Sequence, residues 1–499
     1  MRLCSGPVAD ESEKEPSEEE ESAPEAAAPS VNADESSVGK AKAKPRWVDR
    51  AKAPTLIWMV CAIVYVAFLG GRIFETSPDN HYAHLANSWL EGRLDHGANP
   101  PGTNDWACFD TELKDLCPNN RFSFSDHERY RWYVSFPPFP AAVIAPAVAV
   151  LGVDMPDRFY WALIAALGPA FLWLLFRRLR ETRRSSRTWR EDLALTLLFA
   201  FGSVFFYVAV QGTVWFAAHA VAVPLIALYV LYALDARAPL RAGLILGLCF
   251  LTRPTTALLC IFFGFEAMRT QRKATDPSET SDPDDSWWRL GVDFVRGVDW
   301  KPAIKLGLKF SAPILVCGGV AMWMNAARFD DPFEFGHSFL QIRWRGRIER
   351  WGLFNYHYMA KNIGVFGSSL PWLSIHSPYV QVSRHGLALW VTTPALLMAL
   401  WPKKLNKLMV GLWCALIPVA ILNLMYQNSG WAQFGYRFAL DYMVLIFVII
   451  ALGKRRFGVG FALMMVWAIA INAFGAVTFN RMEQYYSQDS SQEVMYQPD

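Results

Sequence analysis

Long apolar stretches alternate with polar or charged stretches along the chain from residue 54 onward. Runs of this length and hydrophobicity are typical of helices that cross a bilayer, whose hydrocarbon core requires about 20 residues of helix. The runs that we interpret as spans are residues 54–71, 159–176, 193–210, 217–234, 243–251, 255–268, 310–327, 387–401, 408–425, 438–452 and 457–474. The pattern therefore predicts an all-α polytopic membrane protein with a bundle of about eleven transmembrane helices.

Basic residues gather beside alternate ends of these runs and set the orientation. The basic stretch at 40–52 precedes the first span, and the rule that positively charged loops stay in the cytosol places the amino terminus inside. Residues 136–152 form a further apolar run that contains three prolines near its start and is short for a span. If this run crossed, the arginine-rich stretch 177–190 would lie outside, so we interpret it as a juxtamembrane or re-entrant helix.

This orientation predicts the organisation of the chain into loops and domains. A transmembrane domain occupies residues 54–480, with juxtamembrane helices in two large outer loops. The outer loops are residues 72–157 and 328–386, the largest cytosolic loop is 269–309, and residues 481–499 form a polar outer tail.

Residues 1–53 differ in composition from the rest of the chain. They are rich in Glu, Asp, Ser, Pro and Ala and end in a basic segment next to the first span. Such a segment cannot bury enough apolar surface to fold, so we expect a disordered acidic cytosolic tail without a signal peptide. The whole chain has 53% apolar residue types and 21 tryptophans, which excludes an ordinary water-soluble globule.

The stretch at 77–94, directly after the first span, predicts a short helix lying on the membrane surface. Ser77 suits the N-cap and Pro78 the first helical position, and apolar residues recur at helical spacing from Tyr82 onward. Asp79 would then lie in the first turn, where the helix dipole favours an ionised carboxylate. Two interpretations of Asp79 stay open: a base at the mouth of a membrane cavity, or only a cap of the helix.

Two of the eight cysteines fall in the first outer loop, whereas five others lie within apolar runs. Cys108 and Cys117 are close enough in sequence to close a small loop in an oxidising compartment. We therefore expect a disulfide between them.

Charged residues near the predicted outer face are candidates for ligand binding, because a charge at the edge of the hydrocarbon is costly without a partner or a task. Arg253 lies at a hairpin corner and either binds a phosphate or extends to the interface. Arg437 enters a span together with Asp441 at i+4, so it either faces a ligand or forms an internal ion pair.

The second outer loop carries His337 and Arg343 among further arginines and aromatic residues. Several arginines near a membrane suit either an anionic lipid phosphate or a solvated face. The sequence contains no Walker or dinucleotide glycine pattern and no zinc-knuckle spacing. It establishes no cofactor and leaves open whether a divalent cation takes part.

Three short motifs resemble those of a known superfamily. They are Asp79-Asn80-His81-Tyr82, Phe136-Pro137-Pro138-Phe139-Pro140, and Arg328-Phe329-Asp330-Asp331-Pro332-Phe333 after the seventh span. In this arrangement the chain resembles the polytopic lipid-linked-sugar glycosyltransferases of the GT-C fold, which include protein O-mannosyltransferases and bacterial aminoarabinose transferases.

The resemblance implies a GT-C-like bundle and a specific chemistry. Asp79 would act as the base on an acceptor from a lipid, a glycan or a protein, while a polyprenyl-phosphate sugar donor lies in a membrane cavity. His81 and Tyr82 lie in the matched motif, so the resemblance implies a substrate-binding role for them. The other candidates for substrate binding follow from their place near the outer face: Arg131, Arg253, His337, Arg343 and Arg437. The implied setting is a bacterial inner membrane with the active site on the periplasmic side.

Two other classes of protein are compatible with this sequence. A lipid or sugar transporter or flippase would also have many spans and intramembrane arginines, and a non-catalytic membrane scaffold would need only the spans. Acidic and aromatic residues in large loops on one side favour chemistry at one face over alternating access. We find no internal repeat of the kind that builds two-halved transporters.

Overall fold

The computed structural model describes residues 47–102, 104–118, 123–273, 287–342 and 344–487. The chain divides into two compact units, Met1–Trp47 and Val48–Asp499. Of the first unit only Trp47 is among the described residues. Residues 1–46 of the predicted disordered tail fall outside them, whereas residues 47–53 form the start of helix α1, so the prediction is wrong for this last part of the tail.

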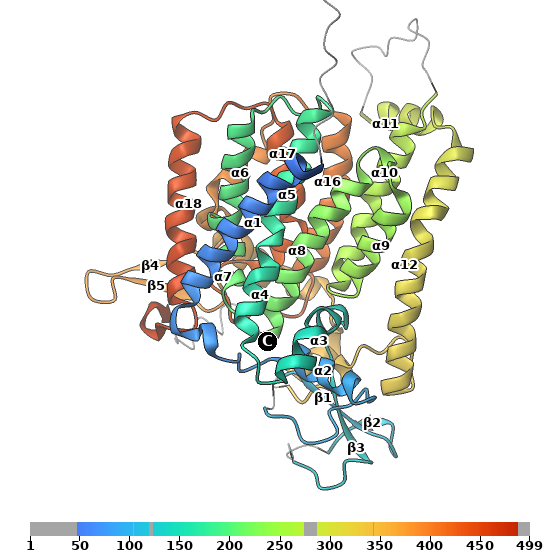
Figure 1. Cartoon of the computed structure of the whole chain (residues 1–499), viewed down its shortest axis with the longest axis vertical. Helices are drawn as coiled ribbons and strands as arrows, with labels where there is room; N and C mark the ends of the chain where they lie inside the picture. Colours follow the sequence, from blue (N-terminus) through green and yellow to red (C-terminus); the bar gives the residue numbers. More distant parts are fainter. Residues whose placement is uncertain (1–46, 103, 119–122, 274–286, 343, 488–499) are drawn as a thin grey trace, which may run out of the picture. The chain divides into compact units, whose positions relative to one another are not determined.

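The second unit is mainly helical, and its apolar helices form a bundle (Figure 1). The bundle helices are α1 (Trp47–Leu69), α4 (Asp157–Ala165), α5 (Leu167–Glu181), α6 (Trp189–Phe201), α7 (Phe205–Ala209), α8 (Val214–Ala233), α9 (Pro239–Phe250), α10 (Cys260–Thr270), α12 (Trp300–Phe329), α15 (Leu389–Thr392), α16 (Lys407–Leu424), α17 (Leu440–Leu452) and α18 (Val459–Thr478). Among the described residues, six helical stretches are long and apolar enough to cross a membrane. They are Lys52–Phe74, Asp157–Glu181, Val214–Ala236, Trp300–Phe329, Lys407–Leu424 and Val459–Thr478. The chain is accordingly an integral membrane protein.

The predicted count of about eleven spans is not confirmed, because the remaining apolar runs form shorter or broken helices. The run at 193–210 divides into α6 and α7, and the run at 387–401 divides into α15 and a 3₁₀ segment that begins at Pro394. Proline at the first residue of such a segment removes a backbone donor and favours a break there.

The predicted surface helix at 77–94 is shorter and more deeply placed than expected. It is α2 (His81–Leu90), and most of its residues are buried, in part against α3 (Phe139–Leu151). Asn80 is its N-cap and not Ser77, whose amide and hydroxyl donate to Asp157 at 2.7 and 2.5 Å. Asp79 therefore lies in the turn before the helix. α3 has thirteen residues, fewer than a span requires.

The loops at this end also contain β-structure, which corrects the all-α prediction. One antiparallel sheet has the order β2–β1–β3, from β1 (Trp106–Asp110), β2 (Asp115–Leu116) and β3 (Tyr130–Val134). The second sheet joins β4 (Trp372–Leu373), β5 (Val380–Ser383) and β6 (Tyr486–Ser487). Short strands bounded by turns lack the apolar run length by which spans are recognised. The structure joins Cys108 and Cys117 in a disulfide with 5.5 Å between Cα atoms, linking β1 to the segment after β2.

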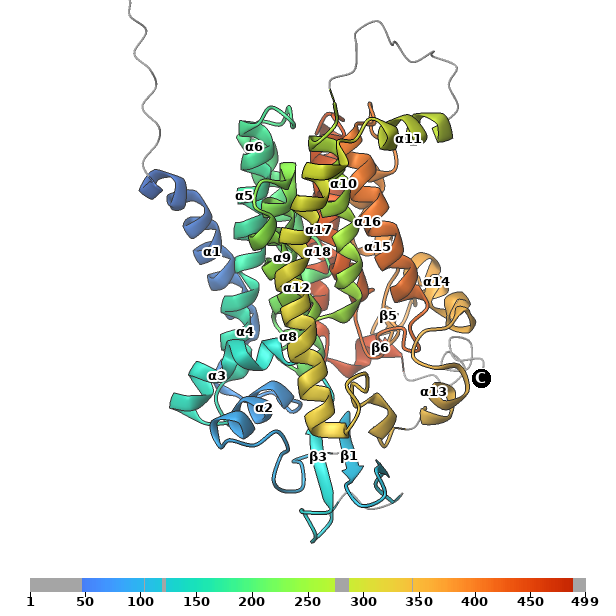
Figure 2. The ribbon, with the colours of Figure 1, turned by 90° about the vertical axis from the view of Figure 1, so that its right-hand side faces the viewer.

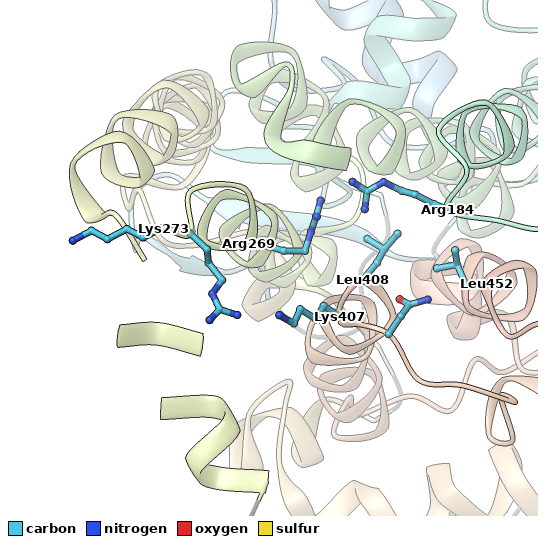
Figure 3. A pocket seen from close by; sticks show the side chains of 8 residues that line it. Arg184, Arg269, Lys273, Lys407, Leu408 and Leu452 are labelled. Carbon is cyan, nitrogen blue, oxygen red and sulfur yellow. The ribbon is translucent and has the colours of Figure 1, made fainter. Parts of the chain in front are cut away.

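The opposite end of the bundle is rich in basic residues. Figure 2 shows α11 (Trp287–Arg296) lying across this end, far from α2, α3 and the β1–β3 sheet. Arg184, Arg269 and Lys407 surround a hollow there (Figure 3). The positive-inside rule predicts that this end lies in the cytosol.

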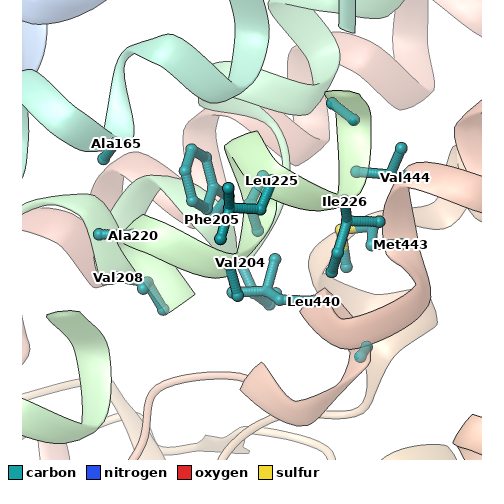
Figure 4. Packing of buried hydrophobic residues seen from close by; sticks show 14 of the residues in the cluster. Ala165, Val204, Phe205, Val208, Ala220, Leu225, Ile226, Leu440, Met443 and Val444 are labelled. Carbon is teal, nitrogen blue, oxygen red and sulfur yellow. The ribbon is translucent and has the colours of Figure 1, made fainter. Parts of the chain in front are cut away.

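The centre of the bundle is packed with apolar side chains. Every residue of α17 is buried, and α8 is buried along most of its length. Val204, Phe205, Ile226, Leu440 and Met443 belong to the cluster between α7, α8 and α17 (Figure 4). Because α17 is buried completely and α8 along most of its length, these two helices form a fixed platform for the loops at their ends.

The packing of α9 against α12 depends on two glycines four residues apart. A Cβ atom on Gly243 would lie 1.9 Å from the Phe310 carbonyl oxygen, and one on Gly247 would lie 2.6 Å from Cys317 Sγ. Small residues at this spacing allow membrane helices to approach closely. We expect Gly243→Ala to lower the free energy of unfolding by about 1–3 kcal/mol through overpacking. Thermal unfolding in detergent would measure this loss.

Gly264 in α10 provides the matched control for that variant. A Cβ atom there meets no heavy atom within 4 Å. Gly264→Ala should therefore leave stability unchanged or raise it slightly, since alanine favours helix more than glycine does. Equal destabilisation by the two substitutions would contradict the role of the α9–α12 contact.

Candidate functional site

A cavity of about 280 Å³ lies at the end of the bundle that carries α2 and the β1–β3 sheet. It is enclosed by both outer loops, by the start of α8, by the turn after α9 and by the segment before α17. The polar residues that line it include Tyr82, Asp105, Thr252, Arg253, Thr255, His337, Asn423, Gln427, Asn428 and Arg437. Aromatic residues, among them Phe136, Trp215, Phe335, Tyr426 and Phe438, make up much of the rest.

Two aspartates, Asp79 and Asp105, are held near this site by hydrogen bonds from the first residues of α8. The Val214 amide donates to the Asp79 carbonyl oxygen at 2.9 Å. The Trp215 indole N–H donates to Asp105 Oδ2 at 2.8 Å. Asp105 lines the cavity, whereas Asp79 lies next to it and does not line the cavity directly. The sequence singled out Asp79 and missed Asp105.

Asp105 has an unusual backbone conformation that helps to place its side chain. Its φ is +57°, in the left-handed region that Asp and Asn adopt more readily than most residues. Its carbonyl oxygen accepts a hydrogen bond from Ser135 Oγ at 3.3 Å. A solitary acid between a polar loop and a strand gives no sequence signal of this role, because only the turn and the contact with α8 bring it to the cavity.

The charge of Asp105 acts on Asp79. Burial, the larger cause, and the negative charge of Asp105 together raise the pKa of Asp79 to about 6, while a hydrogen bond with Asn104 opposes the rise. Burial also raises the pKa of Asp105, against the opposing effects of the Trp215 hydrogen bond and of the Arg437 charge. Paired carboxylates of this kind are suited to holding or accepting a proton near neutral pH.

Arg437 is the cation that faces the same cavity as Asp105. Its side chain is 4% exposed, and it donates to the carbonyl oxygens of Gly430 and Ala432. Its Nε is buried without a hydrogen-bond partner, and the guanidinium lies over the rings of Phe216 and Phe438. No carboxylate among the described residues forms a salt bridge with it, so a buried positive charge is available to a ligand.

Arg253 lines the cavity as well, but its charge is already compensated. It donates to both carboxylate oxygens of Asp441, at 2.7 and 2.8 Å. Thr255 and Asn423 donate to the same carboxylate at 2.9 and 3.0 Å. Asp441 thus pairs with Arg253 and not with Arg437, its neighbour at i−4, because the turn after α9 brings Arg253 against α17.

Two more of the predicted residues line the cavity with unpartnered polar atoms. The Tyr82 hydroxyl and His337 Nδ1 are buried and have no hydrogen-bond partner among the described residues. Burial lowers the pKa of His337, which favours the neutral ring. Both groups can bind a polar ligand without first breaking an internal hydrogen bond.

Three predicted residues are not placed in the cavity lining. His81 is buried in α2, where it stacks on Trp106 with 4.7 Å between ring centroids. Arg131 lies on β3 with its side chain 44% exposed and its Nε 3.8 Å from Asp95 Oδ2, and it does not line the cavity. Arg343 lies outside the described residues.

The described residues contain no group of three or more His, Cys, Asp or Glu side chains that could hold a metal ion. Asp79 and Asp105 supply two carboxylates, fewer protein ligands than an all-protein calcium site uses. Whether a divalent cation participates stays open, and the chemistry derived from the residues of this site does not require one.

The apolar bundle and the polar cavity at one of its ends define an integral membrane protein with a site confined to one face. No protein-family model matches the chain, and no curated protein matches it. Among solved structures it is similar to the archaeal oligosaccharyltransferase AglB from Archaeoglobus fulgidus, determined in complex with an inhibitory peptide and a dolichol-phosphate. The sequences are 13% identical, the TM-score is 0.41, and the match covers 90% of this chain and 58% of that chain. We therefore draw the function from the cavity itself.

Proposed function

We propose that this protein is a membrane glycosyltransferase that moves a sugar from a polyprenyl-phosphate-linked donor to an acceptor on the outer face of the membrane. The acceptor is a lipid, a glycan or a protein, and the anomeric centre is inverted. The observation that carries this proposal is that an acid, Asp105, and a buried cation without a carboxylate partner, Arg437, face one cavity at the membrane-facing end of the outer loops.

The composition of the cavity suits both parts of such a donor. Arginine binds phosphate oxygens through several N–H groups, and Arg437 is the cation of this cavity that forms no salt bridge with a carboxylate among the described residues. The aromatic residues of the lining provide apolar surface for a prenyl chain and flat rings for a sugar. The positive-inside arrangement of the opposite end supports placing this cavity on the non-cytosolic side.

The reaction would proceed as a single displacement. The acceptor oxygen attacks the anomeric carbon, and the bond from this carbon to the phosphate oxygen breaks, with its electron pair leaving on the phosphate. Asp79 accepts the proton of the acceptor hydroxyl, and Asp105, which lines the cavity, favours protonation of Asp79 through its negative charge. Arg437 offsets the charge that develops on the departing phosphate.

The proposal can be tested on lipid extracts and on the purified protein. Cells that lack the protein should accumulate the polyprenyl-phosphate sugar and lose one glycan. Purified protein in nanodiscs should release polyprenyl phosphate from a radiolabelled donor when the acceptor is supplied. A flippase would instead move the labelled donor between leaflets with the sugar still attached, and that result would overturn the proposal.

The pKa of Asp79 predicts the pH dependence of transfer. A base must be ionised to accept a proton, so kcat/KM should fall as the pH drops below about 6. Because the charge of Asp105 contributes to the raised pKa of Asp79, Asp105→Asn should shift this acid limb to lower pH. A pH profile of donor consumption for both proteins would measure the shift. An unchanged acid limb in Asp105→Asn would contradict electrostatic coupling of the two carboxylates.

A further inference from the structure

A second cavity, of about 480 Å³, lies at the opposite end of the bundle, beside α11. Five cationic side chains line it: Arg184, Arg269, Arg272, Lys273 and Lys407. Asn406, Leu408 and Leu452 complete the lining. Figure 3 shows Arg184, Arg269 and Lys407 grouped around Leu408, while Lys273 points away from them at the rim.

The carboxylates near this cavity balance only part of its charge. Asp235 pairs with Arg184 and, at 2.7 Å, with Arg269. Glu266 pairs with Arg269 at 2.6 Å. Among the described residues, no carboxylate forms a salt bridge with the other three cations of the lining, Arg272, Lys273 and Lys407. The five cationic side chains of the lining are thus balanced by only two carboxylates, Asp235 and Glu266.

The rule that basic residues gather at the cytosolic face does not by itself explain this arrangement. Three other arginines of this end each pair with a carboxylate: Arg177 with Glu181 at 2.7 Å, Arg187 with Glu191 at 3.1 Å, and Arg180 with Asp192. Like charges repel, so a surface without a ligand would tend to disperse unpaired cations. Here they converge on a cavity that also has an apolar side.

Two details of the lining indicate an anion. Arg272 Nε is buried without a hydrogen-bond partner among the described residues, while its guanidinium lies over the Phe294 ring of α11 at 5.2 Å. α16 begins at Lys407, and the amide groups at the start of a helix together with the helix dipole favour negative charge. Arginine, lysine and a helix start are the groups with which proteins bind phosphate.

We infer that this cavity binds a phosphate group on the cytosolic side, carried either by an anionic phospholipid headgroup or by a soluble phosphorylated molecule. Leu408 and Leu452 would contact the apolar part of the ligand, and Arg272 and Lys407 would contact the phosphate. This site is separate from the transferase cavity, and its occupancy does not depend on the function proposed above.

Two binding assays on the full chain distinguish the sources of the phosphate. In the first, the protein is placed in nanodiscs of phosphatidylcholine with 20% phosphatidylglycerol, on the order of physiological anionic content, and the phosphatidylglycerol retained after detergent washing is measured by mass spectrometry. In the second, inorganic pyrophosphate is titrated into protein in neutral detergent, followed by calorimetry. Retained lipid assigns the headgroup, and bound pyrophosphate assigns a soluble ligand.

The variant Arg272→Gln/Lys407→Gln should weaken whichever binding is observed at least about tenfold, since it removes two charged donors. The matched control, Lys403→Gln/Lys404→Gln, removes the same charge from the exposed loop before α16 and should bind as the natural protein does. If the double variant does not fold, Lys407→Gln alone serves, because the Lys407 side chain is exposed. Absence of both kinds of binding, or equal losses in variant and control, would overturn the inference. Neither assay requires sugar transfer. A negative result in both assays would therefore contradict the phosphate site without contradicting the proposed transferase function.

Discussion

Asp79→Asn is expected to reduce sugar transfer by about 10²–10⁴-fold, the usual contribution of a general base. Asparagine has a similar shape but cannot accept the proton of the acceptor hydroxyl. The backbone hydrogen bond from Val214 to the Asp79 carbonyl is unaffected by this change, so the turn before α2 should keep its conformation. Steady-state transfer assays on purified protein would measure the loss, with the thermal unfolding midpoint recorded in parallel.

Asp115→Asn is the matched control, because Asp115 is an exposed carboxylate of the same outer loop. It should transfer sugar at the natural rate. Full activity in Asp79→Asn would remove this residue from the role of base. If Asp105→Asn then showed the loss instead, the carboxylate that lines the cavity would take that role.

Arg437→Gln is expected to reduce kcat by about 10²–10³-fold, the loss typical when a charged or polar group that stabilises a developing anion is removed. The Arg437 guanidinium is buried, faces the cavity, and forms no salt bridge with a carboxylate among the described residues, so its charge is available to the leaving phosphate. Arg437→Lys should recover part of the activity, because lysine keeps the charge but loses the planar arrangement of donors.

The control for this prediction is Arg345→Gln in the second outer loop. Arg345 pairs with Glu349 at 2.6 Å and does not line the cavity, so transfer should be unchanged. A purely structural role for Arg437 would lower the unfolding midpoint of Arg437→Gln and Arg437→Lys alike without partial recovery of kcat by lysine. That pattern would contradict a role in stabilising the leaving phosphate.

The sequence predicted the membrane class of this protein for a simple reason. Hydrophobic runs and basic loops respond directly to the bilayer, whose thickness and charge asymmetry act on each segment separately. Runs interrupted by proline, such as the one at 387–401, were harder to interpret, because a broken helix and a continuous one can have the same composition. The number of spans therefore could not be obtained by counting apolar runs.

The candidate site was predictable only in part. Asp79 and Tyr82 lie in a motif, and Arg253, His337 and Arg437 were recognisable as charged or polar residues near the outer face. Asp105 carries no comparable signal, since its place depends on a left-handed turn and on the indole of Trp215, 110 residues away.

By itself the sequence determined that the chain enters the membrane, which end of the bundle is basic, and that polar chemistry gathers in the loops at the other end. These properties depend on local composition, so each can be predicted from the residues of one segment alone. Only the tertiary structure decided that Asp441 compensates Arg253, that Arg437 forms no salt bridge with a carboxylate among the described residues, and that Arg131 does not line the cavity. Such pairings are chosen by distances between segments far apart in the chain, and a low-dielectric interior makes the difference between a compensated and an uncompensated charge large.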